Sequence, residues 1–387
     1  MSKTNVVLSA AFALSLLAPV AARAQNTNDA DIRTFATLPQ GITDDPNNPG
    51  KVLPLGHPEG LARDLKGNIY AATFDAGYQN YIYVYDEIGR LTATVKIPDD
   101  DLPLGRAPLG MVTSKDEKYL YVNEVLNGDV LRYDLPLTDA SKPSFVYNIC
   151  GGFIVAFGLS SDEFCGLNAN DIGPDGRLYI SDNGAGPSFV FSEKYRKGRI
   201  FVLDPATGKS SVWFKGLKGE LDVQIASTPE FGVNGVAFSK DGRELYMANM
   251  STDVIYRMPL IDCGGEDKCL PGNLAVFVKG KGINGPDNIY FDDNGLLWVA
   301  SGQNDRVVAI DRTGRIVSKV GIFNGLTRGG APDGLLQPSG IVVSKGRVYT
   351  CNESSRGLRP TPDLVPEEIW DELRLFTITE IRPFIRP

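Results

Sequence analysis

One pattern of hydrophobic and polar positions recurs along most of the chain. A polar residue or glycine precedes an apolar stretch, a turn rich in Asp, Lys, Gly and Asn, and a second stretch rich in aromatic residues. Short alternating stretches joined by such turns are typical of β-hairpins. Successive copies begin roughly 50 to 65 residues apart, at Gly60, Gly110, Asp171, Gly235, Asn288 and Gly340.

A third strand-like stretch follows in most copies, as in Tyr81–Asp86 and Arg199–Asp204. Six copies of about four strands each predict an all-β protein, a six-bladed β-propeller whose four-stranded antiparallel blades surround a central channel. Residues 32–38 and 373–379 remain as terminal strands that would close the ring. We therefore expect residues 25–387 to form a single propeller domain.

The first 24 residues have a different pattern. Lys3 precedes a small, apolar run from Val6 to Ala22, and the sequence Ala22-Arg23-Ala24 resembles a cleavage site. This layout predicts a secretory signal peptide over residues 1–24 and an exported protein, periplasmic or secreted. The run is too short, and too interrupted by Pro19, for a comfortable transmembrane helix.

Charge limits the possible partners. The chain has 39 basic and 47 acidic residues, a net charge of −8, and loss of Lys3 and Arg23 with the leader would make it more acidic. An acidic surface repels phosphate backbones and anionic lipids, so we expect no nucleic acid and no membrane partner. A small-molecule substrate remains the expected partner, and nothing in the sequence predicts a protein partner.

Five cysteines in an exported chain favour disulfides. Cys263 and Cys269 bracket a short polar segment, and Cys150 and Cys165 bracket a glycine-rich loop, so these two pairs are predicted to be bridged. Cys351 is then free. Spacing alone does not fix this connectivity, and five buried thiols are the alternative.

Polar residues recur where the hairpins open and close. The start of the first strand and the end of the second lie at the same end of an antiparallel pair, so these residues should ring one mouth of the channel. Carboxylate and amide oxygens without sulfur or imidazole suit a hard cation, above all Ca²⁺, although another divalent cation is possible. Asn and Asp are also ordinary turn residues, which is the competing interpretation. The candidates at the first-strand starts are Glu59, Asn170, Asp171, Asn234, Asp287 and Asn288.

Four short motifs also carry a resemblance: His57-Pro-Glu-Gly, Asn170-Asp-Ile, Asn234-Gly-Val and Gly285-Pro-Asp-Asn-Ile. They resemble the calcium-dependent six-bladed propeller superfamily of senescence marker protein, gluconolactonase and paraoxonase. The resemblance implies that the metal ligands are Glu59, Asn170, Asn234 and Asp287, with Asn288 added as in the paraoxonase form. It departs at Leu109, where paraoxonases carry a histidine, and this chain has one histidine in all.

The expected activity is metal-dependent hydrolysis of a lactone or ester. The cation would polarise the carbonyl, and a carboxylate would activate water as general base. Asp287, Asp182 and Glu124 are the candidates for that base. Two alternatives keep the same fold: a lyase, isomerase or condensing enzyme of the strictosidine-synthase-like kind, and a propeller that only binds a ligand.

Overall fold

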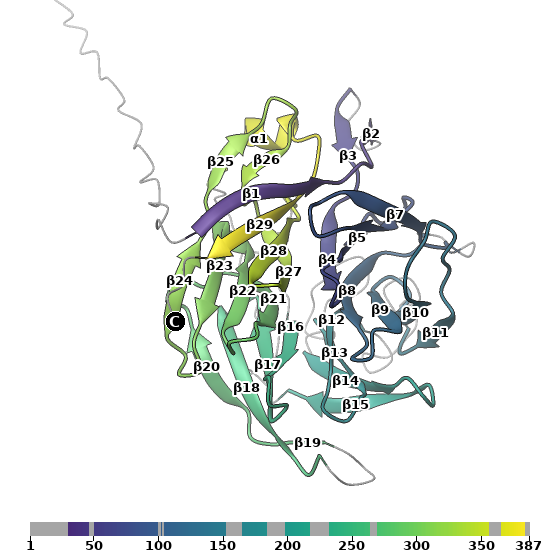
Figure 1. Ribbon diagram of the computed structural model, residues 1–387, viewed down its shortest axis with the longest axis vertical. Helices are drawn as coiled ribbons and strands as arrows, with labels where there is room; N and C mark the ends of the chain where they lie inside the picture. The colour runs from purple at the N-terminus through teal and green to yellow at the C-terminus, as the bar shows by residue number, and fades with distance from the viewer. Residues whose placement is uncertain are drawn as a thin grey trace, which may run out of the picture.

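Alternating strands and tight turns fold the chain into six antiparallel blade sheets. The structure is a computed structural model, and it describes residues 30–45, 50–99, 102, 104–151, 165–183, 198–216, 232–263, 269–355 and 365–383. The predicted leader, residues 1–24, lies outside the described residues. The predicted six-bladed propeller with four-stranded antiparallel blades is confirmed (Figure 1). No helix of the described part is long and apolar enough to cross a membrane.

Each of the first three blades consists of four consecutive strands. Blade 1 holds β4 (Pro58–Arg63), β5 (Ile69–Thr73), β6 (Tyr81–Tyr85) and β7 (Leu91–Lys96). Blade 2 holds β8 (Pro108–Thr113), β9 (Tyr119–Glu124), β10 (Asp129–Asp134) and β11 (Phe145–Asn148). Blade 3 holds β12 (Leu167–Ile172), β13 (Leu178–Asp182), β14 (Arg199–Asp204) and β15 (Lys209–Lys215).

Blades 4 and 5 repeat this order with one addition. Blade 4 holds β16 (Val233–Phe238), β17 (Glu244–Asn249), β18 (Val254–Ile261) and β20 (Ala275–Lys279), and β19 (Leu270–Pro271) also pairs with β18. Blade 5 holds β21 (Pro286–Phe291), β22 (Leu297–Ser301), β23 (Arg306–Ile310) and β24 (Ile316–Val320). A 3₁₀ turn, Gly302–Asn304, follows β22.

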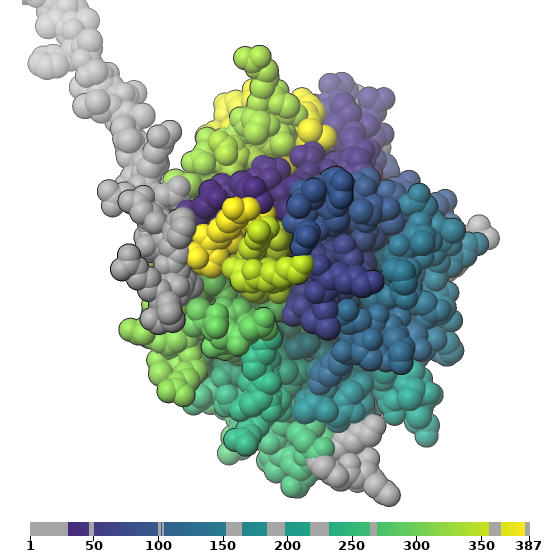
Figure 2. All heavy atoms as spheres, in the orientation of Figure 1, coloured from purple at the N-terminus to yellow at the C-terminus, as the bar shows by residue number. Residues whose placement is uncertain are grey.

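Blade 6 joins the two ends of the chain. Its strands are β27 (Pro338–Ser344), β28 (Arg347–Asn352), β29 (Thr377–Pro383) and β1 (Ala30–Thr37), and β1 pairs antiparallel with β29. Figure 2 shows this purple N-terminal strand beside the yellow C-terminal one. The predicted closure by terminal strands is confirmed. Helix α1 (Glu367–Glu372) precedes this part of the chain. The C-terminal strand begins later than expected, because the N–H groups of Arg374 and Leu375 bond to the Gly330 carbonyl instead of to a neighbouring strand.

Two hairpins stand outside the six sheets, β2 (Ile42–Asp44) with β3 (Val52–Pro54) and β25 (Phe323–Leu326) with β26 (Pro332–Gly334). The first strands of the blades, β4, β8, β12, β16, β21 and β27, each contact the next around the centre, and β27 contacts β4 (Figure 1). Between the blades lie apolar clusters such as the one that joins Tyr179, Phe238 and Met247. Isolated blades would leave these faces in water, so closing the ring buries them.

The turn chemistry seen in the sequence has a direct structural role. Asp64 accepts hydrogen bonds from the backbone N–H groups of Gly67 and Asn68, at 2.9 and 2.8 Å, and from the Tyr70 hydroxyl at 3.0 Å. Asp292 does the same in blade 5, where its partners include the Trp298 indole N–H at 3.0 Å. An acidic residue therefore fixes the first turn of a blade and anchors the aromatic residue of the second strand.

Both predicted disulfides are present, Cys150–Cys165 and Cys263–Cys269. Cys351 is a free thiol and is fully buried. The first bridge connects the residues after β11 to those before β12, and the second closes a loop after β18.

Candidate metal centre

Every inner strand is irregular where it begins. The pairing register shifts between Pro58 and Gly60, and at the equivalent place in the other five blades. The residues that follow the first paired position form what we call the bulge ring: Glu59, Leu109, Asn168, Asn234, Asp287 and Ser339. A β-bulge re-aims side chains and bends the strand, and such bulges are frequent beside active sites.

Neighbouring bulges are in direct contact. A Cβ atom on Gly60 would lie 1.8 Å from the Leu109 carbonyl oxygen, and one on Gly110 would lie 2.4 Å from that of Asn168. In four of the six blades a glycine follows the ring member, and it packs against the backbone of the ring member of the next blade. These contacts hold neighbouring ring members close together around the channel.

The register separates two asparagines in blade 3, Asn168 and Asn170. Leu167 pairs with Asp182 as Val233 pairs with Asn249, so Asn168 is the equivalent of Asn234. Asn170 lies two residues further along β12, and its amide donates a 2.7 Å hydrogen bond to Asn123 of blade 2. Asn170 is therefore not the register equivalent of Asn234, although its Oδ1 atom is also buried without a hydrogen-bond partner. The signal that identifies Asn168 is its separation from the end of the second strand, which equals that of Asp287 from Ser301.

Four members of the bulge ring carry a side-chain oxygen that is buried and has no hydrogen-bond partner. These atoms are Glu59 Oε2, Asn168 Oδ1, Asn234 Oδ1 and Asp287 Oδ1, in residues that are no more than 4% exposed. Burying a polar atom without a partner is costly, so such atoms are rare in folded proteins. Four of them at equivalent positions fit a site that binds a cation.

The donor set fits a hard cation of the Ca²⁺ type. Two carboxylates, Glu59 and Asp287, and two amides, Asn168 and Asn234, offer only oxygen. Within the described ranges no three His, Cys, Asp or Glu side chains form a cluster able to hold a metal ion by themselves. Ligation here would therefore depend on the amides as much as on the acids.

Burial perturbs the pKa values of the carboxyl groups at this site. Burial raises the pKa of Glu59 well above its ordinary value, and the charges of Asp287 and Glu353 raise it further. Burial raises the pKa of Asp287 to about 7, opposed by a hydrogen bond from Asn234. Acids placed together away from water favour a cation among them or a proton on one of them.

Two of the three candidates for the general base are engaged elsewhere. Asp182 Oδ2 accepts from Arg199 Nε at 2.7 Å, and its Oδ1 accepts from the Gly166 N–H at 2.9 Å. Glu124 Oε1 accepts from the Ala107 and Leu126 N–H groups, and Oε2 accepts twice from Asn127. Both acids bind the ends of their own blades together.

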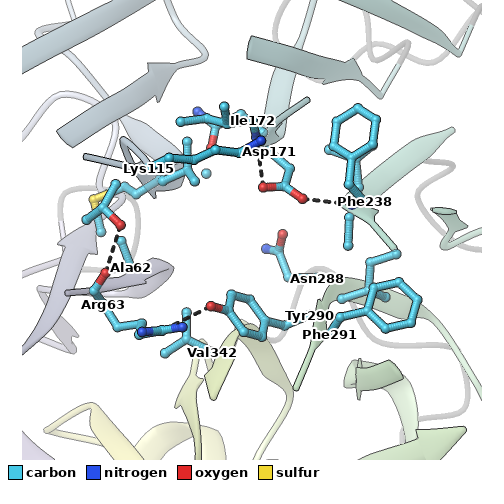
Figure 3. Close-up of a pocket in the computed structure, with 18 of the residues that line it drawn as sticks. Ala62, Arg63, Lys115, Asp171, Ile172, Phe238, Asn288, Tyr290, Phe291 and Val342 are labelled. Atoms are coloured by element: carbon cyan, nitrogen blue, oxygen red, sulfur yellow. Dashed lines mark hydrogen bonds between the residues drawn. The ribbon is translucent and has the colours of Figure 1, made fainter. Parts of the chain in front are cut away.

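The other two predicted ligands lie on the channel wall. Asn170 and Asn288 line a cavity of about 530 Å³ between the inner strands, and Figure 3 shows Asn288 inside it. Asp171 lines the same cavity, and its carboxylate accepts from the Ile172 and Phe238 N–H groups at 2.8 and 2.7 Å. Asp171 therefore joins blades 3 and 4 with both of its oxygens.

The single histidine is held beside the first bulge. His57 Nδ1 lies 2.6 Å from Asp75 Oδ1, and its ring packs against Phe376 at 4.2 Å between centroids. The second Asp75 oxygen accepts from the Gly56 N–H at 2.7 Å. This network fixes the approach of the chain to Glu59.

Comparison with known proteins agrees with the fold. The model of the SMP-30/gluconolactonase/LRE-like region matches residues 151–322, a segment that includes Asn168, Asn234 and Asp287. No curated protein matches the sequence at a significant level. The sequence-based resemblance to the SMP-30/gluconolactonase group of six-bladed propellers is thus confirmed.

Solved structures extend the likeness to nearly the whole chain. A gluconolactonase from Xanthomonas campestris shares 14% identity and a TM-score of 0.55, over 92% of this chain and 91% of its own. A calcium-binding protein, regucalcin, from Agrobacterium tumefaciens has 16% identity and a TM-score of 0.52, over 91% of this chain and 97% of its own. A streptogramin B lyase has 13% identity and a TM-score of 0.50, over 92% of this chain and 98% of its own. At such identities the likeness establishes the fold, and the fold alone does not choose between hydrolase and lyase.

Proposed function

We propose that this protein is an exported, Ca²⁺-dependent hydrolase of a lactone or ester. The observation that carries the proposal is the set of four buried, unpartnered oxygens on Glu59, Asn168, Asn234 and Asp287. They occupy equivalent positions of four blades in a fold shared with a gluconolactonase and with regucalcin. Metal and substrate would meet at the end of the channel where the inner strands begin.

In this proposal a bound Ca²⁺ supplies the positive charge that polarises the substrate carbonyl and stabilises the developing oxyanion. Glu59, Asn168 and Asn234 hold the ion through the oxygens that have no other partner. Asp287 is the fourth ligand and takes the proton from the attacking water, since Asp182 and Glu124 are occupied by hydrogen bonds. Ser181 supports this arrangement by donating a 2.5 Å hydrogen bond to the Asn234 carbonyl.

The direct experiment is hydrolysis of simple γ- and δ-lactones and of an aryl ester, with Ca²⁺ and with excess chelator. Hydrolysis should require the metal and should place one oxygen from ¹⁸O-labelled water in the new carboxylate. A lyase would form a carbon–carbon double bond without taking up label. Tight binding of the lactone without turnover would instead support a propeller that binds a ligand and is not an enzyme.

Export completes the proposal. The mature domain would span residues 25–387, and its two disulfides agree with an oxidising compartment. N-terminal sequencing of the protein recovered outside the cytoplasm should begin at Gln25. Recovery of a chain that begins at Met1 would contradict the assignment of residues 1–24 as a leader.

A further inference from the structure

The cavity of about 530 Å³ extends to the end of the channel opposite the bulge ring. Its wall includes the last residue of five inner strands, whereas the ring members lie where those strands begin. These five residues are Arg63, Thr113, Ile172, Phe238 and Phe291. The volume is typical of pockets that bind small molecules, and the proposed mechanism gives this end of the channel no role.

One cation on the wall of this cavity has unused hydrogen-bond donors. Arg63 Nε donates a 3.1 Å hydrogen bond to the Tyr290 hydroxyl, and both residues line the cavity (Figure 3). The Nη atoms of Arg63 make no hydrogen bond and no ion pair with any other residue that the structure describes. A guanidinium group held in this way presents a fork of N–H donors that matches a carboxylate.

The other charged groups on the wall are bound to the protein. Lys115 Nζ donates to the Gly173 carbonyl at 2.7 Å, and Lys240 Nζ lies 3.0 Å from a carboxylate oxygen of Asp293. Three acids on the wall accept hydrogen bonds from neighbouring residues, namely Glu117, Asp171 and Asp241. The basic and acidic residues on the wall balance in number, so the preference for an anion comes from the free donors of Arg63.

Two asparagines bring uncharged polar atoms to the same cavity. Asn170 is 7% exposed, and its Oδ1 atom is buried without a hydrogen-bond partner. This oxygen is an acceptor, so a ligand would pair with it through a donor such as a hydroxyl group. Figure 3 shows the Asn288 side chain inside the cavity, where its amide can both donate and accept.

We propose that this cavity, which we call the distal site, binds a small hydroxycarboxylate. Its carboxylate pairs with the Arg63 fork, its hydroxyl donates to Asn170 Oδ1, and its carbon chain lies against Met111 and Ile341. Opening of a lactone ring yields a hydroxy acid, so the ligand class matches the product of the proposed reaction. That match rests on the proposed function, whereas the distal site itself does not.

The test of the ligand class is calorimetry in excess chelator with γ-hydroxybutyrate, butyrate and 1,4-butanediol. The hydroxy acid should bind with one site per chain. Butyrate lacks the hydroxyl and the diol lacks the carboxylate, so each should bind more weakly by roughly tenfold or more. Equal binding of all three compounds would contradict the assigned chemistry.

Single variants locate the binding. Arg63→Gln removes the charge and the fork, and should lower the affinity for γ-hydroxybutyrate by roughly tenfold or more. Tyr290→Phe keeps the ring and removes the hydroxyl that orients Arg63, so it should weaken binding by a smaller factor. Arg257→Gln is the matched control, because Arg257 lies on β18 outside the cavity wall and its loss should leave binding unchanged. Thermal unfolding verifies that each variant is folded.

Three results would overturn the inference. One is a parent protein that does not bind the hydroxy acid, and another is binding that persists unchanged in Arg63→Gln and Tyr290→Phe. The third is binding that requires Ca²⁺, because the ligand would then occupy the metal centre. A parent that hydrolyses no lactone would contradict the proposed function alone, since binding to the distal site is measured without metal and without turnover.

Discussion

Gly235 of blade 4 packs against the backbone of Asp287 in blade 5, so closely that a Cβ atom on Gly235 would lie 2.4 Å from the Asp287 carbonyl oxygen. Gly340 makes the same contact with Glu59, at 2.3 Å. Each acid of the bulge ring is thus positioned by a glycine of the preceding blade. A side chain at either glycine would separate the two strands.

Gly235→Ala tests this relationship. Because the clash is with backbone, the strands must move apart, and we expect unfolding free energy to fall by about 1–3 kcal/mol. Ca²⁺ affinity should fall as well, because Asp287 moves away from Asn234. Denaturant unfolding and calorimetry measure the two effects. Gly329→Ala is the control, since its Cβ would approach only Thr327, at 3.9 Å; an equal loss of affinity there would refute the argument.

Asp287→Asn separates the two roles given to this acid. Loss of one of the fixed charges should weaken Ca²⁺ binding, and loss of the base should leave turnover slow by roughly a hundredfold or more at saturating metal. Glu59→Gln should also bind Ca²⁺ more weakly, but excess Ca²⁺ should restore most of its rate. Steady-state kinetics over a Ca²⁺ titration distinguishes them. If excess Ca²⁺ fully restored the turnover rate of Asp287→Asn, Asp287 would be a metal ligand and not the general base.

Asn168 and Asn170 are distinguished by single alanine variants. Asn168→Ala removes an oxygen that has no other partner, so Ca²⁺ affinity should fall with little loss of stability in chelator. The Asn170 Oδ1 atom is also unpartnered, but its amide N–H donates to Asn123, and Asn170→Ala should cost about 1 kcal/mol of stability through loss of that hydrogen bond. Its Ca²⁺ affinity should stay close to that of the parent. The opposite pattern in calorimetry would restore Asn170 as the ligand.

The stability of the metal-free protein should depend on pH in an unusual direction. The pKa of Asp287 is raised to about 7, and those of Glu59 and Glu353 are also raised. An acid with a raised pKa in the folded state stabilises the fold below its unfolded pKa, and that stability is lost as pH rises through the folded pKa. In chelator the melting temperature should therefore fall as pH rises from about 4 to about 7, the range between the unfolded and folded pKa of Asp287.

Saturating Ca²⁺ should remove most of this decrease, because the metal replaces the protons. Asp287→Asn should flatten the pH profile in chelator. A metal-free parent whose melting temperature is constant or rises over that range would show that these acids are not buried together.

The sequence by itself determined the fold of this protein. The recurring glycine, apolar stretch, acidic turn and aromatic stretch define a blade through local physics, because Asp64 and Asp292 fix their turns from within a few residues. The number of copies and the two spare terminal strands then predict a closed ring. The pairing of Cys150 with Cys165 and of Cys263 with Cys269 was predicted from short loops, but spacing left five free thiols open, and the structure decided for the two bridges.

The tertiary structure alone decided which polar residues occupy equivalent bulge positions. Asn168 and Asn170 differ by two positions in one strand, and only the bulge at Leu167, paired with Asp182, selects Asn168. Glu124 and Asp182 end second strands and Glu353 directly follows one, yet only the packed structure shows which of their oxygens remain unpaired. Strand pattern depends on neighbours along the chain, whereas unpaired oxygens and mutual repulsion depend on contacts between blades that are far apart in sequence.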